Sequence, residues 1–316
     1  MMGGHLEISV IIPVYNASGF LERAVHSALQ FGEVKEVILI EDKSTDDSLE
    51  VCNRLVSENS RVKLYQHHDK ENHGAGATRN LGLEKAKYEF IAFLDSDDHY
   101  LPNRFDMEKT IFNNPKIEGT FGAIGVEYLS EKGKEEYLAK FNNSTLTTVN
   151  YPAEGDEVFK GLLGLTSKTF GSFFHLNTLT VRKSSIIKNN LHFNESLRVH
   201  QDSDFIIKLA YHCYLKSGII DQAIAIRGVH DNNRITKIVR YSAQYNQRQF
   251  LLWKSLYDWA TSQNLSSEYK KKVYLQYRSF DLSLKTGLNK YSNIVIEAIK
   301  NPEILKTKYR FTYMNS

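Results

Sequence analysis

Three aspartates occur within four residues at the end of one apolar run. Residues 90–94 are apolar, and Asp95, Asp97 and Asp98 follow directly. Carboxylates this close repel one another and resist burial. Mg²⁺ and Mn²⁺ prefer oxygen ligands and are commonly held by one or two carboxylates together with substrate phosphates. The spacing therefore predicts a divalent-cation site, in which the metal offsets the repulsion and neutralises a diphosphate.

Two earlier apolar runs also end in polar residues. Tyr15 and Asn16 follow the run 8–14, and Asp42 follows the run 37–40. Both runs are rich in β-branched residues, which is typical of strands buried on both faces. Ligands bind beyond the carboxyl ends of the strands in an open α/β sheet. A single acidic turn is most often a solvated loop or a helix cap, but three polar turns on one rim favour a ligand site.

Other residues of this half have side chains suited to a nucleotide. Asp42 can accept hydrogen bonds from a base N–H or a sugar hydroxyl. Arg79 can reach a phosphate or a base, although the spacing is equally compatible with a surface helix residue. The turn 72–76 contains Gly-x-Gly and resembles a loop that approaches phosphate, but this pattern alone is weak evidence.

The elements that must position these residues alternate between strand and helix. This alternation, with short turns, predicts a doubly wound α/β sheet. Ser44 or Thr45 is the expected N-cap of the helix after the second strand. The polar stretch 131–150 is expected to be a loop or an insertion. The further elements that we expect are helices at 20–29, 77–87 and 202–212, strands at 62–65, 90–94, 122–128, 177–182 and 219–227, and helices from about 241.

Composition is that of a globular protein, because 41% of the 316 residues are hydrophobic and 24% are charged. No apolar run reaches the roughly 18 residues of a membrane-spanning helix, and the N-terminus lacks a signal-peptide pattern. Cys52 and Cys213 are expected to be reduced core residues, which favours a cytoplasmic protein.

Charge shifts near the end of the chain. Residues 241–316 contain nine Lys and three Arg against two Asp and three Glu, a net charge of +7 in a chain of net charge +3. The same region holds both tryptophans and many tyrosines. Such a shift in composition predicts a boundary near residue 236.

Four motifs, in this order, resemble the family 2 glycosyltransferases. They are Ile-Pro-Val-Tyr-Asn at 12–16, Glu-Asp-Lys-Ser-Thr-Asp-Asp at 41–47, Gly-x-Gly-x-x-Arg-Asn at 74–80 and Phe-Leu-Asp-Ser-Asp-Asp at 93–98. The family has the GT-A fold and uses nucleotide-diphospho-sugars. The resemblance implies a Rossmann-like, doubly wound mixed sheet with a C-terminal helical extension. We expect a catalytic domain at 1–236, with a nucleotide-binding half of about 1–105 and an acceptor half of about 106–236, and a basic, aromatic-rich helical region at 237–316.

The resemblance implies a role for each matching residue. Asp42 would hold the nucleotide base, usually uracil in this family, and Arg79 would lie beside the nucleotide. Asp95 and Asp97 would form the motif for the ribose and the metal. Asp97 would be the direct metal ligand, and Asp98 would assist. Three residues of the first motif would shape the nucleotide pocket, namely Pro13, Tyr15 and Asn16.

An acidic residue at the start of a later helix serves as the catalytic base in the family. The matching stretch carries Gln201-Asp202 where Glu-Asp is usual, so Asp202 would take this role. A base must lie within hydrogen-bond reach of the acceptor hydroxyl. Asp202 could instead be only a helix N-cap, and the two roles are compatible. Asp204 is a poorer candidate, because a shift of two residues along a helix turns it away.

A late segment, 227–236, resembles the family's Arg-x-His segment. Two residues rather than one separate Arg227 from His230. His230 would contact the metal or the diphosphate, although a lone histidine is more often structural. Arg234 could lend positive charge to the leaving phosphate.

The resemblance implies an inverting, metal-dependent glycosyltransferase of the hexosyltransferase type. It would use Mn²⁺ or Mg²⁺ to move a sugar, expected to be UDP-linked, to a hydroxyl of a glycan or lipid-linked acceptor in surface polysaccharide or glycolipid synthesis. The alternative is a non-catalytic nucleotide-sugar-binding or assembly protein. A glycoside hydrolase is less favoured, because its two acids flank a sugar. A nucleotidyltransferase would need a Gly-rich, basic loop where Tyr15 and Asn16 stand.

The basic, aromatic-rich tail has two interpretations. Residues 241–316 could contact anionic lipid, which would place the protein peripherally at the inner face of the membrane. The alternative is a helical cap that packs on the catalytic domain or forms a homodimer contact. Nucleic acid is not an expected partner, because no recognition motif accompanies the charge.

Overall fold

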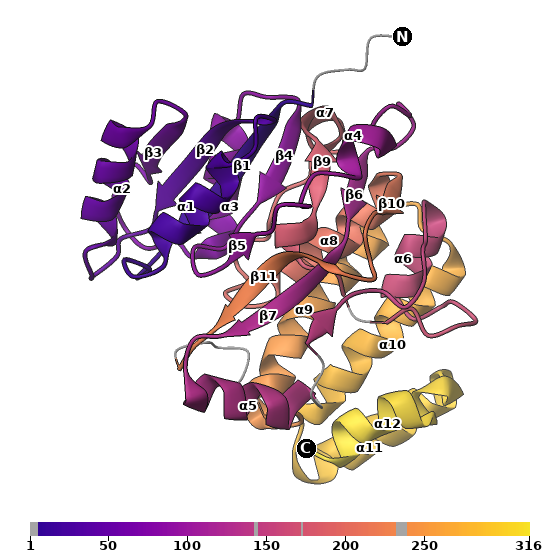
Figure 1. Ribbon diagram of the computed structural model, residues 1–316. Coiled ribbons are helices and arrows are strands. Elements are labelled where there is room, and N and C mark those ends of the chain that lie inside the picture. The colour runs from indigo at the N-terminus through magenta and orange to yellow at the C-terminus, as the bar shows by residue number, and fades with distance from the viewer. Residues whose placement is uncertain (1–5, 142–144, 172, 232–238) are drawn as a thin grey trace. The chain divides into compact units, whose positions relative to one another are not determined.

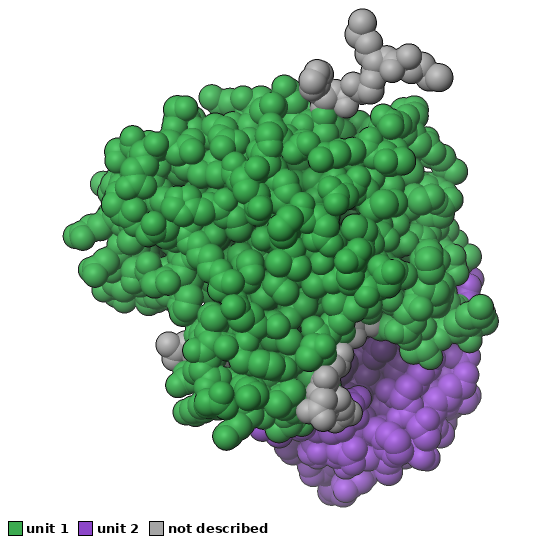
Figure 2. All heavy atoms as spheres, viewed as in Figure 1, with its two compact units in different colours: residues 1–198, 205–233 green, residues 199–204, 234–316 purple. Residues whose placement is uncertain are grey.

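The computed structural model describes residues 6–141, 145–171, 173–231 and 239–316. By their contacts these residues form two compact units (Figure 2). Unit 1 comprises residues up to 198 together with 205–233, and unit 2 comprises 199–204 together with 234–316. The predicted boundary between residues 236 and 237 lies outside the described residues.

Unit 1 is built on a mixed sheet of seven strands (Figure 1). The first half of the chain supplies four parallel strands in the order β3-β2-β1-β4, which is the doubly wound pattern. The antiparallel strand β9 joins β4 to β6, and β10 pairs with β6 at the edge. The strands of this sheet are β1 (Ile8–Val14), β2 (Val34–Glu41), β3 (Val62–Gln66), β4 (Phe90–Phe93), β6 (Gly119–Phe121), β9 (Thr180–Arg182) and β10 (Leu215–Ser217).

A second, four-stranded sheet has the order β5-β11-β7-β8. Its short strand β5 begins directly after residues 95–98, which we call the acidic turn. This turn follows β4, so it connects the large sheet to the second sheet. The strands are β5 (His99–Tyr100), β7 (Ala123–Tyr128), β8 (Leu146–Thr147) and β11 (Ala223–Val229). The helices of unit 1 are α1 (Leu21–Leu29), α2 (Ser48–Glu58), α3 (Ala75–Lys85), α4 (Glu108–Ile111), α5 (Glu131–Phe141), α6 (Asp156–Leu162) and α7 (Lys183–Lys188), with the 3₁₀ turn η1 (Leu176–Thr178).

Both faces of β1 are buried, as its continuous apolar sequence predicts. Successive side chains of a strand point to opposite faces. Even-numbered residues of β1, such as Val10 and Ile12, belong to the core cluster that contains residues of α1. Ile11 points the other way, toward α3, where a Cβ on Gly82 would lie 2.4 Å from its side chain. Helices therefore cover both faces of the sheet, and its carboxyl edge is where the loops meet.

Several expectations from the sequence differ from the structure. The strand expected at 177–182 begins only at Thr180, because Leu176–Thr178 form η1. The N-cap of α2 is Asp47, not Ser44 or Thr45. Ser44 and Thr45 instead bond to the first rim turn: Ser44 Oγ accepts the Asn16 N–H at 3.1 Å, and the Thr45 N–H donates to Asn16 Oδ1 at 2.7 Å. The stretch 131–150 is also not a plain loop, because it contains α5 and β8. Tyr137 of α5 is buried and anchors this helix, which carries mostly charged residues in its first two turns.

Unit 2 is helical, as expected from about residue 241. Its helices α9 and α10 each begin at a serine N-cap, and Ser242 Oγ accepts the Tyr245 N–H at 3.2 Å. Within the described residues, no helix is both long enough and apolar enough to cross a membrane. The elements are α9 (Ala243–Ser262), α10 (Ser267–Ser283), α11 (Gly287–Lys300), η2 (Pro302–Leu305) and α12 (Thr307–Met314), and α8 (Gln201–His212) has its first four residues in this unit.

A fully buried arginine ties the segment between β5 and α4 to η1 and β9. Arg104 pairs with Glu108 at 2.6 Å, and it also donates to the carbonyl oxygens of Asn177 at 2.9 Å and Leu179 at 3.0 Å. Burial raises the pKa of the Glu108 carboxyl, and Arg104 opposes that shift. Removing one partner of such a pair leaves a buried charge uncompensated.

We expect Arg104→Met to lower the free energy of unfolding by about 3–5 kcal/mol, because Glu108 then loses its counter-charge. Urea denaturation followed by circular dichroism measures the change. The double variant Arg104→Met/Glu108→Leu should recover part of the loss. A double variant that is less stable than Arg104→Met would show that the buried charge is not the cause.

Candidate active site

The acidic turn connects β4 of the large sheet to β5 of the small one. β5 pairs antiparallel with β11, and His99 lies opposite Ile226. This register brings the acidic turn alongside the later residues of β11. The fit is close at Gly228, where a Cβ would lie 2.4 Å from the backbone oxygen of Asp97. Only glycine allows the two backbones to approach in this way.

Asp98 is the structural member of the turn. Its Oδ2 accepts a hydrogen bond from Asn177 Nδ2 at 2.5 Å, and its Oδ1 accepts the Gly228 N–H at 2.9 Å. Asn177 Oδ1 also accepts the Asp95 N–H at 3.0 Å, so one side chain braces both ends of the turn. Burial, with the nearby charges of Asp97 and Asp95, raises the pKa of Asp98 well above its ordinary value. These contacts fix the turn between η1 and β11.

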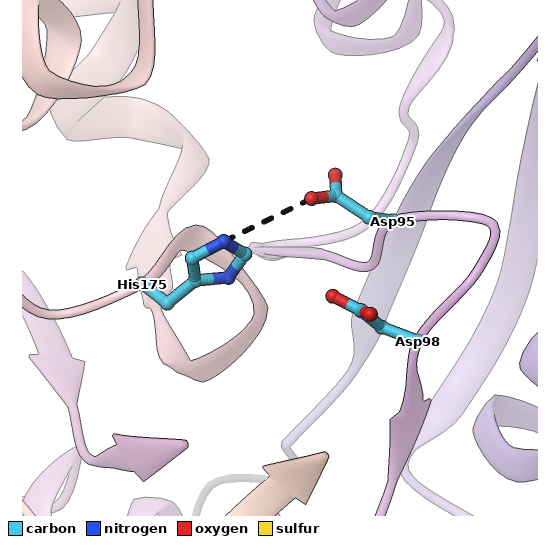
Figure 3. Close-up of side chains that lie close together, drawn as sticks. All are labelled: Asp95, Asp98 and His175. Atoms are coloured by element: carbon cyan, nitrogen blue, oxygen red, sulfur yellow. Dashed lines mark ion pairs between the residues drawn. The ribbon is translucent and has the colours of Figure 1, made fainter. Parts of the chain in front are cut away.

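The negative charge of the Asp95 carboxylate is offset by nearby basic side chains. Burial acts to raise the pKa of the Asp95 carboxyl, but Arg79, together with His175 and Arg227, lowers it overall. Arg79 Nη2 donates to Asp95 Oδ1 at 2.5 Å, and His175 Nε2 lies 3.9 Å from Asp95 Oδ2 (Figure 3). Asp95 is therefore an ionised carboxylate held between an arginine and a histidine.

His175 faces the turn through its Nε2 atom. Its Nδ1 accepts the Asn177 N–H at 3.3 Å. A neutral imidazole that accepts at Nδ1 carries its proton on Nε2, the atom that faces Asp95. His175, Asp95 and Asp98 lie close enough together to hold an ion. In this tautomer, however, the facing nitrogen has no lone pair for a metal, so His175 is better suited to donate to an anion.

Asp97 is the most accessible of the three aspartates. About a third of its side chain is exposed, and its Oδ2 lies 3.2 Å from His230 Nε2. The His230 ring stacks on Phe20, with 4.9 Å between ring centroids, so the ring is held over the turn. The structure thus brings together Asp97 and His230, which the sequence proposed as metal-binding residues.

Arg79 is buried, contrary to its alternative interpretation as a surface helix residue. Its guanidinium lies 5.6 Å from the centroid of Phe193. Among the described residues, its Nε and Nη1 have no hydrogen-bond partner. Unpaired N–H groups of a buried cation are costly, and phosphate or carbonyl oxygens would satisfy them.

A second group of predicted site residues lies beyond the carboxyl ends of β1 and β2. Asp42 accepts the N–H groups of His73 at 2.7 Å and Gly74 at 2.8 Å, and its Oδ2 also accepts from Asn72 Nδ2 at 2.9 Å. Gly74 has a positive φ of 84°, which favours glycine. Asp42 therefore shapes the 72–74 loop, and its contact with a nucleotide base stays a prediction.

The remaining predicted residues are placed as follows. Pro13 lies in β1 opposite Ile40, and Tyr15 is half exposed in the turn beyond it. Asp202 lies in the first turn of α8 and belongs to unit 2, so its role as base stays a prediction. Its Oδ1 accepts the adjacent Ser203 N–H at 2.8 Å. Arg234 lies outside the described residues.

Three residues of the site were not proposed from the sequence, namely His175, Asn177 and Arg227. His175 and Asn177 reach the turn because β9 returns antiparallel beside β4, and no motif marks them. Arg227 stands in the late segment 227–236 and acts to lower the pKa values of both Asp95 and Asp98, but burial prevails only at Asp98. The segment that resembles the Arg-x-His segment already contained Arg227, and that place is the signal from which a role could have been assigned.

The donor set fits a hard divalent cation. Carboxylate oxygens are the ligands that Mg²⁺ and Mn²⁺ prefer, and an imidazole nitrogen is also a suitable ligand for a transition metal. Asp97 offers an accessible carboxylate, His230 faces it, and Asp95 lies two residues away. Asp98 has both oxygens occupied by N–H donors, so it is less available than Asp97 as a ligand.

An open cavity of about 490 Å³ lies elsewhere in unit 1. It contains none of the acidic turn residues, although it shares Phe193 with the environment of Arg79. The predicted metal site is therefore not in this cavity. The cavity is lined by His192, Phe193, Asn194, Glu195, Ser196 and Lys208.

We expect Gly228→Ala to displace the acidic turn and to lower the free energy of unfolding by about 1–3 kcal/mol, since overpacking forces the backbone to shift. Gly19→Ala is the matched control, because a Cβ there has no atom within 4 Å. Chemical denaturation of both variants gives the comparison. Equal stabilities would contradict the close approach of β11 to Asp97.

Comparison with known proteins links this arrangement to a family. The model of "Glycosyl transferase family 2" matches residues 9–168, about half of the chain. A cholesterol galactosyltransferase of Borreliella burgdorferi is 30% identical over 64% of this chain and 55% of its own length. A GalNAc(5)-diNAcBac-PP-undecaprenol beta-1,3-glucosyltransferase of Campylobacter jejuni is 30% identical over 66% of this chain and 71% of its own. An uncharacterised glycosyltransferase of Haemophilus influenzae is 43% identical over 32% of this chain and 40% of its own.

Solved structures share the fold. S. aureus TarS 1–349 in complex with UDP-GlcNAc superposes with a TM-score of 0.61 at 17% identity, over 98% of this chain and 84% of that chain. The mannosyltransferase PcManGT from Pyrobaculum calidifontis, in complex with GDP-Man and Mn²⁺, has a TM-score of 0.53 at 14% identity, over 98% of this chain and 84% of that chain. The fold is therefore GT-A. The chain spans about half the length of two of the three relatives above. The chain belongs to glycosyl transferase family 2.

Proposed function

We propose that the protein transfers a sugar from a nucleotide-diphospho-sugar, with UDP as the expected nucleotide, to a hydroxyl of a glycan or lipid-linked acceptor. The anomeric configuration is inverted in this reaction. The observation that carries the proposal is the acidic turn itself. An accessible Asp97 faces His230, while the ionised Asp95 is paired with the buried Arg79. This arrangement of carboxylates and cations suits a metal-bound diphosphate.

The donor class is supported by chemistry and by the comparisons. Arg79 has unpaired N–H groups among the described residues, which suits an anionic ligand. Two structures with this fold were solved with nucleotide-sugars, one with UDP-GlcNAc and one with GDP-Man and Mn²⁺. The expectation of UDP rests on family resemblance, and the measurement below distinguishes it from GDP and dTDP.

Separate residues of the chain have separate roles in the proposed reaction. Asp202 accepts the proton of the acceptor hydroxyl, and that oxygen then attacks the anomeric carbon of the sugar. Arg79 and His230 orient the leaving diphosphate through hydrogen bonds and charge. Asp97, with Asp95, would hold Mn²⁺ or Mg²⁺. When bound, the cation supplies Lewis-acid stabilisation of the charge that develops on the diphosphate.

The acceptor class is proposed from relatives. One is named for an undecaprenol-linked glycan and another for cholesterol, and each is 30% identical to this chain over about two thirds of its length. Both names describe glycosylation of a lipid or a lipid-linked substrate. We therefore propose a role in glycolipid or surface polysaccharide synthesis.

We expect Mn²⁺ together with one of UDP, GDP and dTDP to raise the melting temperature. A ligand at about 100 times its Kd stabilises the native state by about 2.7 kcal/mol, which corresponds to a shift on the order of 5 °C. Asp97→Asn should lose the metal-dependent part of this shift, because an amide is a poor ligand for a hard cation. Differential scanning fluorimetry measures the effect.

The control for this experiment is Asp221→Asn, since Asp221 is an exposed aspartate of the same unit. It should keep the full shift. If no nucleotide raises the melting temperature of the wild type, the nucleotide-sugar proposal fails. If Asp97→Asn keeps the metal-dependent shift, Asp97 is not the metal ligand.

We expect Asp202→Asn to reduce sugar transfer by about 10²–10⁴-fold, because loss of a general base removes that much rate. The nucleotide-dependent shift in melting temperature should persist. Release of nucleoside diphosphate from the matching donor is measured with a panel of lipid-linked and free saccharide acceptors. Near-normal transfer by the variant would exclude Asp202 as base. Donor binding without transfer by the wild type would favour a non-catalytic nucleotide-sugar-binding protein.

A further inference from the structure

Helix α11 of unit 2 presents its apolar side to solvent. In a helix that packs against a core, apolar residues at i, i+3, i+4 and i+7 face inward. Here the residues with this spacing are exposed: Leu288 is 88% exposed and Ile299 is 77% exposed. The exposed apolar stripe of α11 consists of Leu288, Tyr291, Val295, Ile296 and Ile299.

The opposite side of the same helix buries a charge. Glu297 is 3% exposed, and its Oε2 accepts Arg278 Nε at 2.9 Å. Its Oε1 accepts the Tyr274 hydroxyl at 3.0 Å and Asn301 Nδ2 at 2.8 Å. These contacts attach α11 to α10 through polar groups. Ile294 and Ala298 of α11 also pack on the apolar cluster of unit 2, so the helix has apolar residues on its exposed side as well as on its packed side.

More exposed apolar residues follow in the next turns. Leu305, Phe311 and Met314 are all exposed. Lys290 Nζ, in the first part of α11, reaches the backbone oxygen of Ser316 at 3.1 Å, so the end of α12 lies close to the start of α11. Exposed apolar residues scattered singly need no explanation, but a continuous stripe marks an interaction site.

The charge around this surface is positive. Residues 284–316 contain five Lys and one Arg against two Glu, and one of these is the buried Glu297. The other, Glu303, pairs with Lys271 at 2.9 Å. Lys300, Lys306 and Lys308 are exposed. Basic residues beside an apolar stripe that contains an aromatic residue are the signature of a helix that lies in an anionic membrane interface.

We propose that the exposed apolar stripe of α11 docks on an anionic lipid surface, with the helix lying in the interface plane and the flanking lysines contacting lipid phosphates. Fourteen residues of helix extend about 21 Å, which is too short to cross a bilayer. The stripe supplies the apolar burial and the lysines supply the attraction to negative charge.

A second copy of the chain is a less favourable occupant. A two-fold interface would place the same stripe and the same lysines of two protomers against each other. Like charges brought together in this way repel. An anionic lipid surface instead complements both the apolar stripe and the positive charge.

The test is vesicle flotation with the full chain. We expect the wild type to float with phosphatidylcholine vesicles that contain about 30% phosphatidylglycerol, and to float poorly with phosphatidylcholine alone. Val295→Asp/Ile299→Asp should weaken partitioning roughly tenfold or more, because two apolar side chains become hydrated carboxylates. Lys300→Glu/Lys306→Glu should weaken binding to the anionic vesicles by a similar factor.

Ile187→Asp is the matched control, because Ile187 is an apolar residue of α7 that is 66% exposed and lies outside this surface. It should bind like the wild type. All changed residues are exposed, and circular dichroism verifies that each variant is folded. Failure of the folded wild type to float with anionic vesicles overturns the proposal. A wild-type dimer in light scattering that Val295→Asp/Ile299→Asp dissociates, without flotation, would assign the stripe to self-association instead.

Discussion

The two hydrogen bonds to Asp98 are the constraint on which the site depends. Asn177 and Gly228 occupy both oxygens of a buried carboxylate, and they come from η1 and β11, which are far apart in sequence. These bonds hold the junction of the two sheets at the acidic turn. Asp95 and Asp97 precede this fixed point in the same turn, so the bonds to Asp98 limit where their carboxyl groups can lie, and Arg79 and His230 then contact those groups. A buried carboxylate here is tolerable because it is fully hydrogen-bonded.

Cations around the turn complete the arrangement. Arg79 pairs with Asp95, and Arg227 also lowers the pKa values of Asp95 and Asp98 against the effect of burial. These two arginines come from α3 and from β11, which are far apart in sequence. Such a site is suited to an anion and a cation that bind together. The arginine N–H groups can donate to the anion, and the carboxylates can contact the cation.

Much of the fold could be predicted from the sequence, because β1, β2 and β4 are continuous apolar runs whose polar successors define one rim. The acidic turn could be identified for the same reason, whereas Arg79 was singled out by the Gly-x-Gly-x-x-Arg-Asn motif of α3. His175 and Asn177 could not, since they reach the turn only through the antiparallel return of β9. The N-cap of α2 was mispredicted because Ser44 and Thr45 bond to Asn16, a partner almost 30 residues away. Local pattern identifies elements, whereas partners distant in sequence decide which polar side chains converge.

Glu297 also determines the rotation of α11 about its own axis. A half-turn roll of the helix would move this carboxylate away from Arg278 and Tyr274 and would leave the Arg278 guanidinium without one of its counter-charges. The cost of that separation opposes the roll that would hide the apolar side chains. The outward stripe is therefore a permanent feature of the folded helix, and it does not depend on a conformational change to become available.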